Sequence, residues 1–177
     1  MHGLPGNGHV QGHADAPAGG RDRELRELRP NPGARLTTLR LRADGGARGN
    51  PGPAALGVVI EDDQGMRLRT FHRFLGVATN NQAEYQALIE GLKAVADWKP
   101  DRLEVYLDSK LVVEQVNGKW RVKESELKEL HKQATELLQQ FGDRVTVSHV
   151  GREENRGADK LVNMALDERV KKPKPSG

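Results

Sequence analysis

The sequence predicts an α/β domain with a five-stranded mixed sheet: a three-strand antiparallel meander plus two parallel strands, flanked by helices. Short segments of alternating apolar residues come first, separated by turn-forming residues, which is typical of an antiparallel meander. Two further apolar segments then alternate with stretches of helical periodicity, as in strands joined by helical crossovers. The 177 residues, 36% of them hydrophobic, suffice for one domain with a core and argue against two.

The meander is expected to consist of three strands joined by short turns. In its first strand, two leucines alternate with two arginines, which is the pattern of a half-buried strand. The connecting segments are rich in Gly, Asp, Asn and Pro, the residues that favour turns. We expect the strands at residues 37–43, 54–60 and 66–75, and the turns at residues 44–53 and 61–65.

Helices and two more strands follow the meander. Residues 78–98 change to helical spacing, with Thr79 or Asn80 as the N-terminal cap, and Pro100 lies just beyond the end. A polar loop is expected at residues 151–157. The other expected elements are a strand at 102–109, a short helix at 110–116, a helix at 124–141, a strand at 144–150 and a last helix at 158–170.

The two ends of the chain differ from this body, which spans residues 37–170. Residues 1–36 are rich in Gly, Pro and Arg without a hydrophobic period, so we expect a disordered extension. Residues 171–177 are basic and interrupted by proline, as in a flexible tail. No apolar run approaches the roughly 20 residues of a membrane span, and no signal peptide is visible. A cytoplasmic protein that does not associate with membranes, and that is a monomer, is therefore expected.

Composition excludes several kinds of chemistry. The chain has no Cys, so it has no disulfide, no thiolate zinc site and no Cys nucleophile. The formal net charge of +3 permits nucleic-acid binding but does not argue for it.

Three aspartates have an ordinary explanation when each is taken alone. Asp44 follows the first strand and begins a Gly-rich turn, where Asp is common. Asp108 ends the fourth strand just before a helix, where it fits a cap. Asp159 falls in the first turn of the last helix, where an acid complements the helix dipole.

Glu84 is different because it lies on the apolar stripe of its helix. The residues four, eight and eleven positions later are all apolar: Leu88, Leu92 and Val95. An acid facing the sheet with them is costly unless it is paired or binds a metal. Glu84 therefore favours a functional site over a set of unrelated structural acids.

The four acids are expected to converge. If the first and fourth strands are parallel neighbours, Asp44 and Asp108 lie side by side at the carboxyl end of the sheet, where α/β proteins place ligand sites. The fifth strand would deliver Asp159 to the same edge. Such carboxylates repel one another unless cations hold them, and oxygen-only ligands suit Mg²⁺ or Mn²⁺. Two such ions form a phosphoryl-transfer device, one activating water and the other stabilising the leaving oxygen.

Residues 41–167 resemble type 1 ribonuclease H. Four motifs match in order: DGGARGNPGPAALG at 44–57, TNNQAEYQAL at 79–88, LDSKLVVEQVNG at 107–118 and REENRGADKLVNMA at 152–165. The resemblance implies the ribonuclease H fold and an endonuclease that hydrolyses the RNA strand of RNA–DNA hybrids with two metal ions. It also implies products with 5′-phosphate and 3′-hydroxyl ends.

The resemblance assigns roles to the acids. The family's Asp-Glu-Asp-Asp set falls on Asp44, Glu84, Asp108 and Asp159. By that likeness Asp44 bridges both ions, Asp159 helps hold the ion of the attacking water, and the other two acids hold the second ion. Glu84 also lies near the ribose 2′-hydroxyl of the cleaved strand, the group that distinguishes RNA from DNA.

The family's substrate-contacting positions also have matches here. Asn50 and Asn80 fit turn or cap roles as well, and both interpretations can hold together. Trp120, flanked by basic residues, fits either a contact with DNA or a packed core position. The substrate-binding candidates are Asn50, Thr79, Asn80, Asn81, Ser109, Lys110, Trp120 and Arg152.

Two departures place the chain in a branch of that family. Arg152 stands where many members have a loop histidine, so we expect it to act electrostatically or not at all, and His149, three residues earlier, is expected to be structural. The basic protruding helix of some members is missing. Whether double-stranded RNA is also cut stays open. The alternatives are a non-catalytic nucleic-acid-binding module of the same fold, or another nuclease of the superfamily, which the first two motifs argue against.

Overall fold

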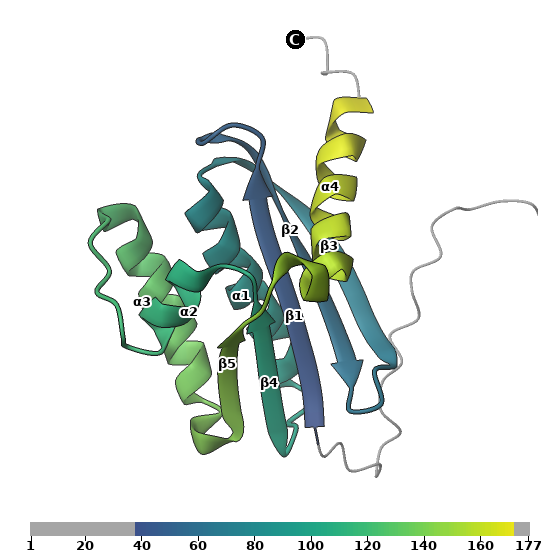
Figure 1. Cartoon of the computed structure of the whole chain (residues 1–177), viewed down its shortest axis with the longest axis vertical. Helices are drawn as coiled ribbons and strands as arrows, with labels where there is room; N and C mark the ends of the chain where they lie inside the picture. Colours follow the sequence, from purple (N-terminus) through teal and green to yellow (C-terminus); the bar gives the residue numbers. More distant parts are fainter. Residues whose placement is uncertain (1–37, 172–177) are drawn as a thin grey trace, which may run out of the picture.

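The computed structural model describes residues 38–171, drawn in colour in Figure 1. The predicted N-terminal extension and basic tail lie outside the described residues, except that Lys171 ends the last helix. The elements are β1 (Thr38–Ala47), β2 (Gly52–Asp62), β3 (Arg67–Ala78), α1 (Asn80–Ala96), β4 (Arg102–Leu107), α2 (Lys110–Val116), α3 (Ser125–Gln139), the 3₁₀ helix η1 (Gly142–Arg144), β5 (Val145–His149), the 3₁₀ helix η2 (Arg152–Asn155) and α4 (Arg156–Lys171).

The five strands form one mixed sheet in the order β3-β2-β1-β4-β5 (Figure 1). β2 pairs antiparallel with both β1 and β3, and β4 pairs parallel with both β1 and β5. The parallel neighbours require helical crossovers, which α1 supplies between β3 and β4, and α2 and α3 supply between β4 and β5. The predicted fold class is confirmed.

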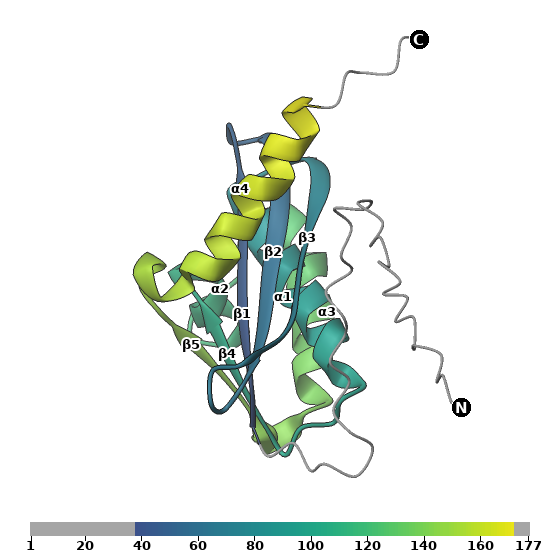
Figure 2. The ribbon, with the colours of Figure 1, turned by 90° about the vertical axis from the view of Figure 1, so that its right-hand side faces the viewer.

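Helices cover the two faces of the sheet unequally. Figure 2 shows α1 and α3 on one side and α4 on the other. The larger core lies under α1 and α3, where Leu88, Leu92 and Val95 are fully buried. A smaller cluster joins α4 to β2 through Val162 and Ala55. The stripe read from the sequence therefore faces the sheet as predicted.

Two glycines let helices approach the central strands closely. A Cβ at Gly45 of β1 would lie 2.1 Å from the carbonyl carbon of Ala83 in α1. A Cβ at Gly57 of β2 would lie 2.3 Å from the carbonyl oxygen of Ala158 in α4. Real side chains do not tolerate such contacts, so each glycine is required by close packing. This packing brings the starts of α1 and α4 to the strand position occupied by Asp44.

The strand boundaries differ from the prediction around the first turn. Asp44 was expected just after the strand, yet it lies inside β1, paired with Gly57 of β2. The glycines that resemble turn residues continue the ladder to Ala47, because antiparallel pairing with β2 satisfies their backbone groups. The turn shrinks to residues 48–51, and β3 likewise extends to Ala78.

Capping residues define where α1 and α2 begin. Thr79 caps α1 through a capping box in which its side chain accepts from the Gln82 N–H and the Gln82 side chain accepts from the Thr79 N–H. Ser109, rather than Asp108, caps α2, and its Oγ accepts from the Val112 N–H at 3.3 Å. The loop predicted at 151–157 instead contains η2 and the start of α4.

Across the described part of the chain, none of the helices combines the length and apolar character needed to span a bilayer.

Candidate active site

Three predicted acids meet at the carboxyl ends of the central parallel strands. Ala43 of β1 pairs with Leu107 of β4, so Asp44 and Asp108 follow on neighbouring strands. Glu84 arrives from the first turns of α1, which the close contact at Gly45 holds against β1. One carboxylate oxygen from each of the three acids lies within 4.8 Å of the others. The predicted convergence is confirmed for these three residues.

Asp159, the fourth acid, lies at the edge of this group. It is exposed in the first turn of α4 and does not join the tight cluster of three. It nevertheless lines the same hollow of about 340 Å³, together with Arg48, Asn80 and Arg152. Asp159 therefore lies at the rim of the hollow, while the other three acids lie further inside it.

Burial makes the inner acids hard to ionise. Asp44 is only 6% exposed, and burial, followed by the nearby charge of Asp108, raises its pKa from 3.8 to about 8. Burial and then the charge of Asp44 raise the pKa of Glu84 well above its ordinary value, while the Gly45 backbone N–H opposes that shift. In the absence of cations, these carboxylates destabilise one another.

The unpartnered atoms at this site fit a hard cation. Glu84 Oε2 and Asp108 Oδ1 are buried, and neither has a hydrogen-bond partner among the described residues. Buried polar atoms are normally paired, so two such oxygens in a group of three acids suit a positively charged ligand. An all-oxygen donor set is the kind that Mg²⁺ and Mn²⁺ accept.

Two predicted substrate-contacting asparagines lie at the mouth of the site. Asn80 Oδ1 accepts from the Ala47 N–H at 2.9 Å, and Asn50 Oδ1 accepts from the Asn80 N–H at 3.0 Å. Because a backbone N–H can only donate, these contacts fix which amide atom is the oxygen. Neither NH₂ group has a partner among residues 38–171, so both can donate to a ligand. The turn and ligand interpretations of these residues are therefore compatible.

The α2 side of the site carries the basic candidates. Trp120 is 46% exposed, so it is not a packed core residue. The Lys110 ammonium lies 5.8 Å from the centre of its ring. Three more exposed cations flank Trp120 in the segment beyond α2: Lys119, Arg121 and Lys123.

Asn81, another predicted substrate-contacting residue, is half-buried in the first turn of α1.

Arg152, which stands where many family members have a loop histidine, and His149 both lie close to the acids. Arg152 lines the acidic hollow from η2. His149 Nε2 lies 3.3 Å from the backbone carbonyl oxygen of Asp108, although its side chain is exposed. This backbone contact agrees with the structural role predicted for His149.

Asn155 is a residue of this site that sequence reasoning missed. It is fully buried, and its Nδ2 donates to the Ala43 carbonyl at 2.9 Å, one residue before Asp44. Arg42 adds a second tie by donating to the Glu154 carbonyl at 3.0 Å. Together these contacts fasten η2 to β1. An Asn in a polar loop gives no sequence signal of burial, so only the fold identifies it.

Asn155→Ala is expected to destabilise the protein by about 1–3 kcal/mol, because the Ala43 carbonyl loses its partner in a buried place. It should also lower activity, since η2 carries Arg152 and leads into Asp159. Urea unfolding and hybrid cleavage would be measured side by side. Glu153→Ala is the matched control, because this exposed residue of η2 makes only a 3.8 Å ion pair with Arg156. Equal effects of the two substitutions would contradict the anchoring role.

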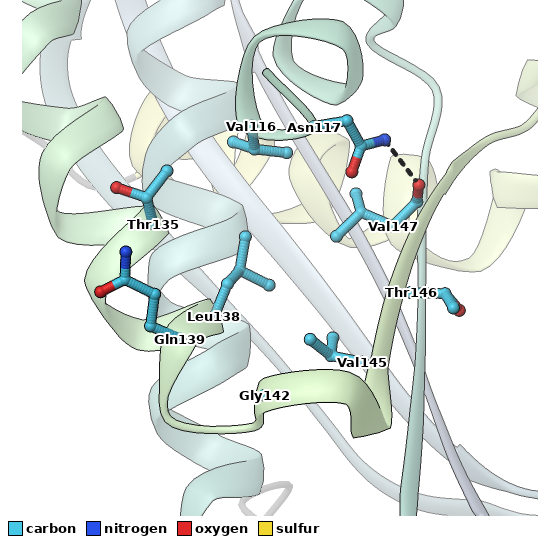
Figure 3. Close-up of a pocket in the computed structure, with 9 residues that line it drawn as sticks. All are labelled: Val116, Asn117, Thr135, Leu138, Gln139, Gly142, Val145, Thr146 and Val147. Atoms are coloured by element: carbon cyan, nitrogen blue, oxygen red, sulfur yellow. Dashed lines mark hydrogen bonds between the residues drawn. The ribbon is translucent and has the colours of Figure 1, made fainter. Parts of the chain in front are cut away.

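A second hollow lies between α2, α3 and β5, away from the acids (Figure 3). It measures about 610 Å³, and its lining includes Val116, Leu138 and Val147 but no ionisable side chain. Asn117 Nδ2 crosses its upper part to donate to the Val147 carbonyl at 3.0 Å. The chemistry therefore belongs to the acidic hollow.

The sheet order and the carboxylates at the ends of β1 and β4 define the class as a ribonuclease H fold with an acidic site. A family model described as "Reverse transcriptase-like" matches residues 42–165. Ribonuclease HI of Halobacterium salinarum is 39% identical over 166 residues, which cover 92% of this chain and 81% of that protein. The bifunctional protein Rv2228c of Mycobacterium tuberculosis is 44% identical over 128 residues, 72% of this chain but 35% of that protein. The chain belongs to the ribonuclease H family, type 1.

Solved structures agree with this assignment. The crystal structure of RNase H1 from Halobacterium salinarum has a TM-score of 0.71 at 43% identity, covering 74% of this chain and 98% of that one. LC11-RNase H1, solved in complex with an RNA/DNA hybrid, has a TM-score of 0.71 at 39% identity, covering 75% and 99%. The same protein, isolated from compost, was also solved separately, with a TM-score of 0.72.

Proposed function

We propose that this protein is an endonuclease that hydrolyses the RNA strand of RNA–DNA hybrids and leaves 5′-phosphate and 3′-hydroxyl ends. The observation that carries the proposal is the group of three acids at the strand ends, two of which have buried oxygens without partners. Membership of the ribonuclease H family supports the reaction, and the hybrid bound to the similar LC11-RNase H1 supports the substrate.

The four acids are proposed to hold two divalent ions, Mg²⁺ or Mn²⁺, which when bound would activate the attacking water and stabilise the leaving oxygen. Asp44 would help to hold both ions, because it belongs to the inner group of three acids and lines the same hollow as Asp159. Glu84 and Asp108 complete the inner side of the site. Asp159 is assigned to the outer side because it lies at the solvent-facing rim.

Recognition of the hybrid is assigned first to the amide donors beside the acids. The free NH₂ groups of Asn50 and Asn80 suit the acceptors of a minor groove, where the ribose 2′-hydroxyl also lies. The Thr79 hydroxyl, whose oxygen accepts from Gln82, keeps its proton for donation. Asn81 and Ser109 are proposed as further backbone contacts. The asparagines and Thr79 lie on or next to α1 and in the β1–β2 turn, whereas Ser109 caps α2, so a bound hybrid would span all three places.

A second contact with the hybrid is assigned to the basic segment beyond α2, which is defined as residues 119–123. Trp120 offers an exposed ring for a sugar or base edge, and Lys110 lies beside it to meet a phosphate. Arg152, which lines the acidic hollow from η2, is proposed to act electrostatically on the substrate phosphate. The amide donors and the basic segment would contact the hybrid on either side of the acids. The scissile phosphate would then lie at the acids.

The deciding experiment compares four labelled substrates of one sequence: the hybrid, double-stranded RNA, single-stranded RNA and single-stranded DNA. Each is incubated with Mg²⁺, with Mn²⁺ and with a chelator. Cleavage of the hybrid's RNA strand that depends on the metal and leaves 5′-phosphate ends is expected. Binding of the hybrid without cleavage would instead favour the non-catalytic module, and cleavage confined to DNA would favour another nuclease of the superfamily.

A further inference from the structure

A buried polar contact joins the active-site helix to α2. Tyr85 directly follows Glu84 in α1 and has no exposed surface. Its hydroxyl donates to Gln115 Oε1 of α2 at 2.6 Å. Gln115 is itself only 5% exposed, which makes it one of three buried polar side chains among the described residues. A buried amide is costly unless both of its ends are paired, so the partner of its other end matters.

The other end of Gln115 holds the basic segment. Its Nε2 donates to the Arg121 carbonyl at 3.4 Å. The start of the same segment is fixed differently, because the Glu114 carbonyl accepts from the Lys119 N–H at 2.9 Å and the Trp120 N–H at 3.1 Å. In the described part of the chain, no other side chain forms a hydrogen bond with the backbone of residues 119–123. Gln115 is therefore the side chain that fixes the part of the segment beyond Trp120.

α3 also contacts Gln115 and Tyr85, through His131. His131 Nε2 lies 3.1 Å from the Gln115 backbone carbonyl. Its ring packs edge-on to Tyr85, with ring centres 6.4 Å apart and an interplanar angle of 79°. Contacts from α1 and α3 thus meet at Gln115 of α2, and residues 119–123, most of them exposed, follow shortly after this junction.

We propose that Gln115, held by Tyr85, is a positioning residue for substrate binding: it sets the place of residues 119–123 relative to the acids. The inference rests on the proposed function, because it assigns Trp120 and its neighbouring cations to the hybrid. A leucine would fill the same volume without needing partners, so the amide is best explained by the two groups that it connects. Its loss should free the segment while the carboxylates stay in place.

The test uses the full chain in a Trp98→Phe background, so that Trp120 is the sole tryptophan. Gln115→Leu and Tyr85→Phe are compared with a control, Gln139→Leu. The control makes the same substitution as Gln115→Leu, but at an exposed glutamine that lines the hollow beside β5. Quenching of Trp120 fluorescence by acrylamide reports on the segment in the free protein. Steady-state cleavage of the hybrid separates KM from kcat.

Gln115→Leu is expected to raise the quenching constant and to raise KM about fivefold, as for one lost hydrogen bond, with kcat within about twofold. Tyr85→Phe should act in the same direction, and the double variant should add little to the larger single effect, since both residues act through one chain of contacts. Gln139→Leu should change neither quantity.

A lower melting temperature with unchanged quenching and unchanged KM would overturn the inference and leave Gln115 a purely structural residue. If Gln115→Leu does not fold, Tyr85→Phe, which removes one oxygen atom only, decides by the same two readouts. If the parent protein does not cleave the hybrid, the proposed function fails. The quenching comparison then still decides whether Gln115 positions the segment.

Discussion

Asp44→Asn is expected to lower hybrid cleavage by about 10³-fold or more, because it removes a buried acid whose pKa responds to Asp108, Glu84 and Asp159. The substitution keeps the size of the side chain and removes a charge that burial penalises. The metal-free variant should therefore be at least as stable as the parent protein. Single-turnover cleavage with saturating enzyme, together with thermal unfolding in a chelator, would measure both effects.

Asp63→Asn is the matched control for this loss of charge. Asp63 is exposed in the β2–β3 turn and makes no contact with the acidic hollow. It should keep full cleavage activity and the parent melting temperature within about 2 °C, as for a surface change of less than about 0.5 kcal/mol. Full activity of Asp44→Asn would end the assignment of the site, whatever the control shows.

Without divalent ions, the thermal stability of the protein should fall as pH rises from about 4 to about 8. In the folded protein the pKa of Asp44 is raised from 3.8 to about 8, so over this interval the folded state binds more protons than the unfolded state. Below the interval both states are protonated. Above it the folded state carries the full repulsion between Asp44, Glu84 and Asp108.

Divalent ions should cancel much of this loss. By the proposed function, Mg²⁺ would bind the assembled carboxylates but not the dispersed ones of the unfolded chain, and at ten times its Kd it would contribute about 1.4 kcal/mol. For a chain of this size the melting temperature then rises by about 3–5 °C. The increase should be larger near pH 8 than near pH 5, where the ion must displace protons from Asp44.

Melting curves at the two pH values, with chelator and with millimolar Mg²⁺, would measure these shifts in the parent protein and in Asp44→Asn. The variant should show a weaker dependence on both pH and Mg²⁺. Identical curves for the two proteins under all four conditions would mean that the acids do not form a coupled cation site.

The strand pairing and the inner acids were predictable because they depend on local pattern. Glu84 was identified from the apolar residues that follow it at helical spacing, and those residues are indeed buried against the sheet. Asp44 and Asp108 were placed together once the order of elements implied parallel neighbours. Such inferences need only the periodicity of apolar residues and the order of the elements, and both can be read from the sequence.

The remainder depended on contacts between distant residues. Asn155 finds its partner 112 positions away, and Gln115 meets Tyr85 across 30 positions. The glycines after Asp44 resembled a turn, and only pairing with β2 makes them strand residues. The rim position of Asp159 likewise follows from where η2 places the start of α4, which no local pattern specifies.

The bond from Asn117 to the Val147 carbonyl has a consequence for solubility and assembly. β5 is the last strand of the sheet, and open strand edges recruit strands from other molecules. Asn117 occupies one acceptor of β5, which is only five residues long. The opposite edge strand, β3, carries charged side chains at Arg67, Arg69 and Arg73. Both edges of the sheet therefore carry features that oppose pairing with a strand of another molecule.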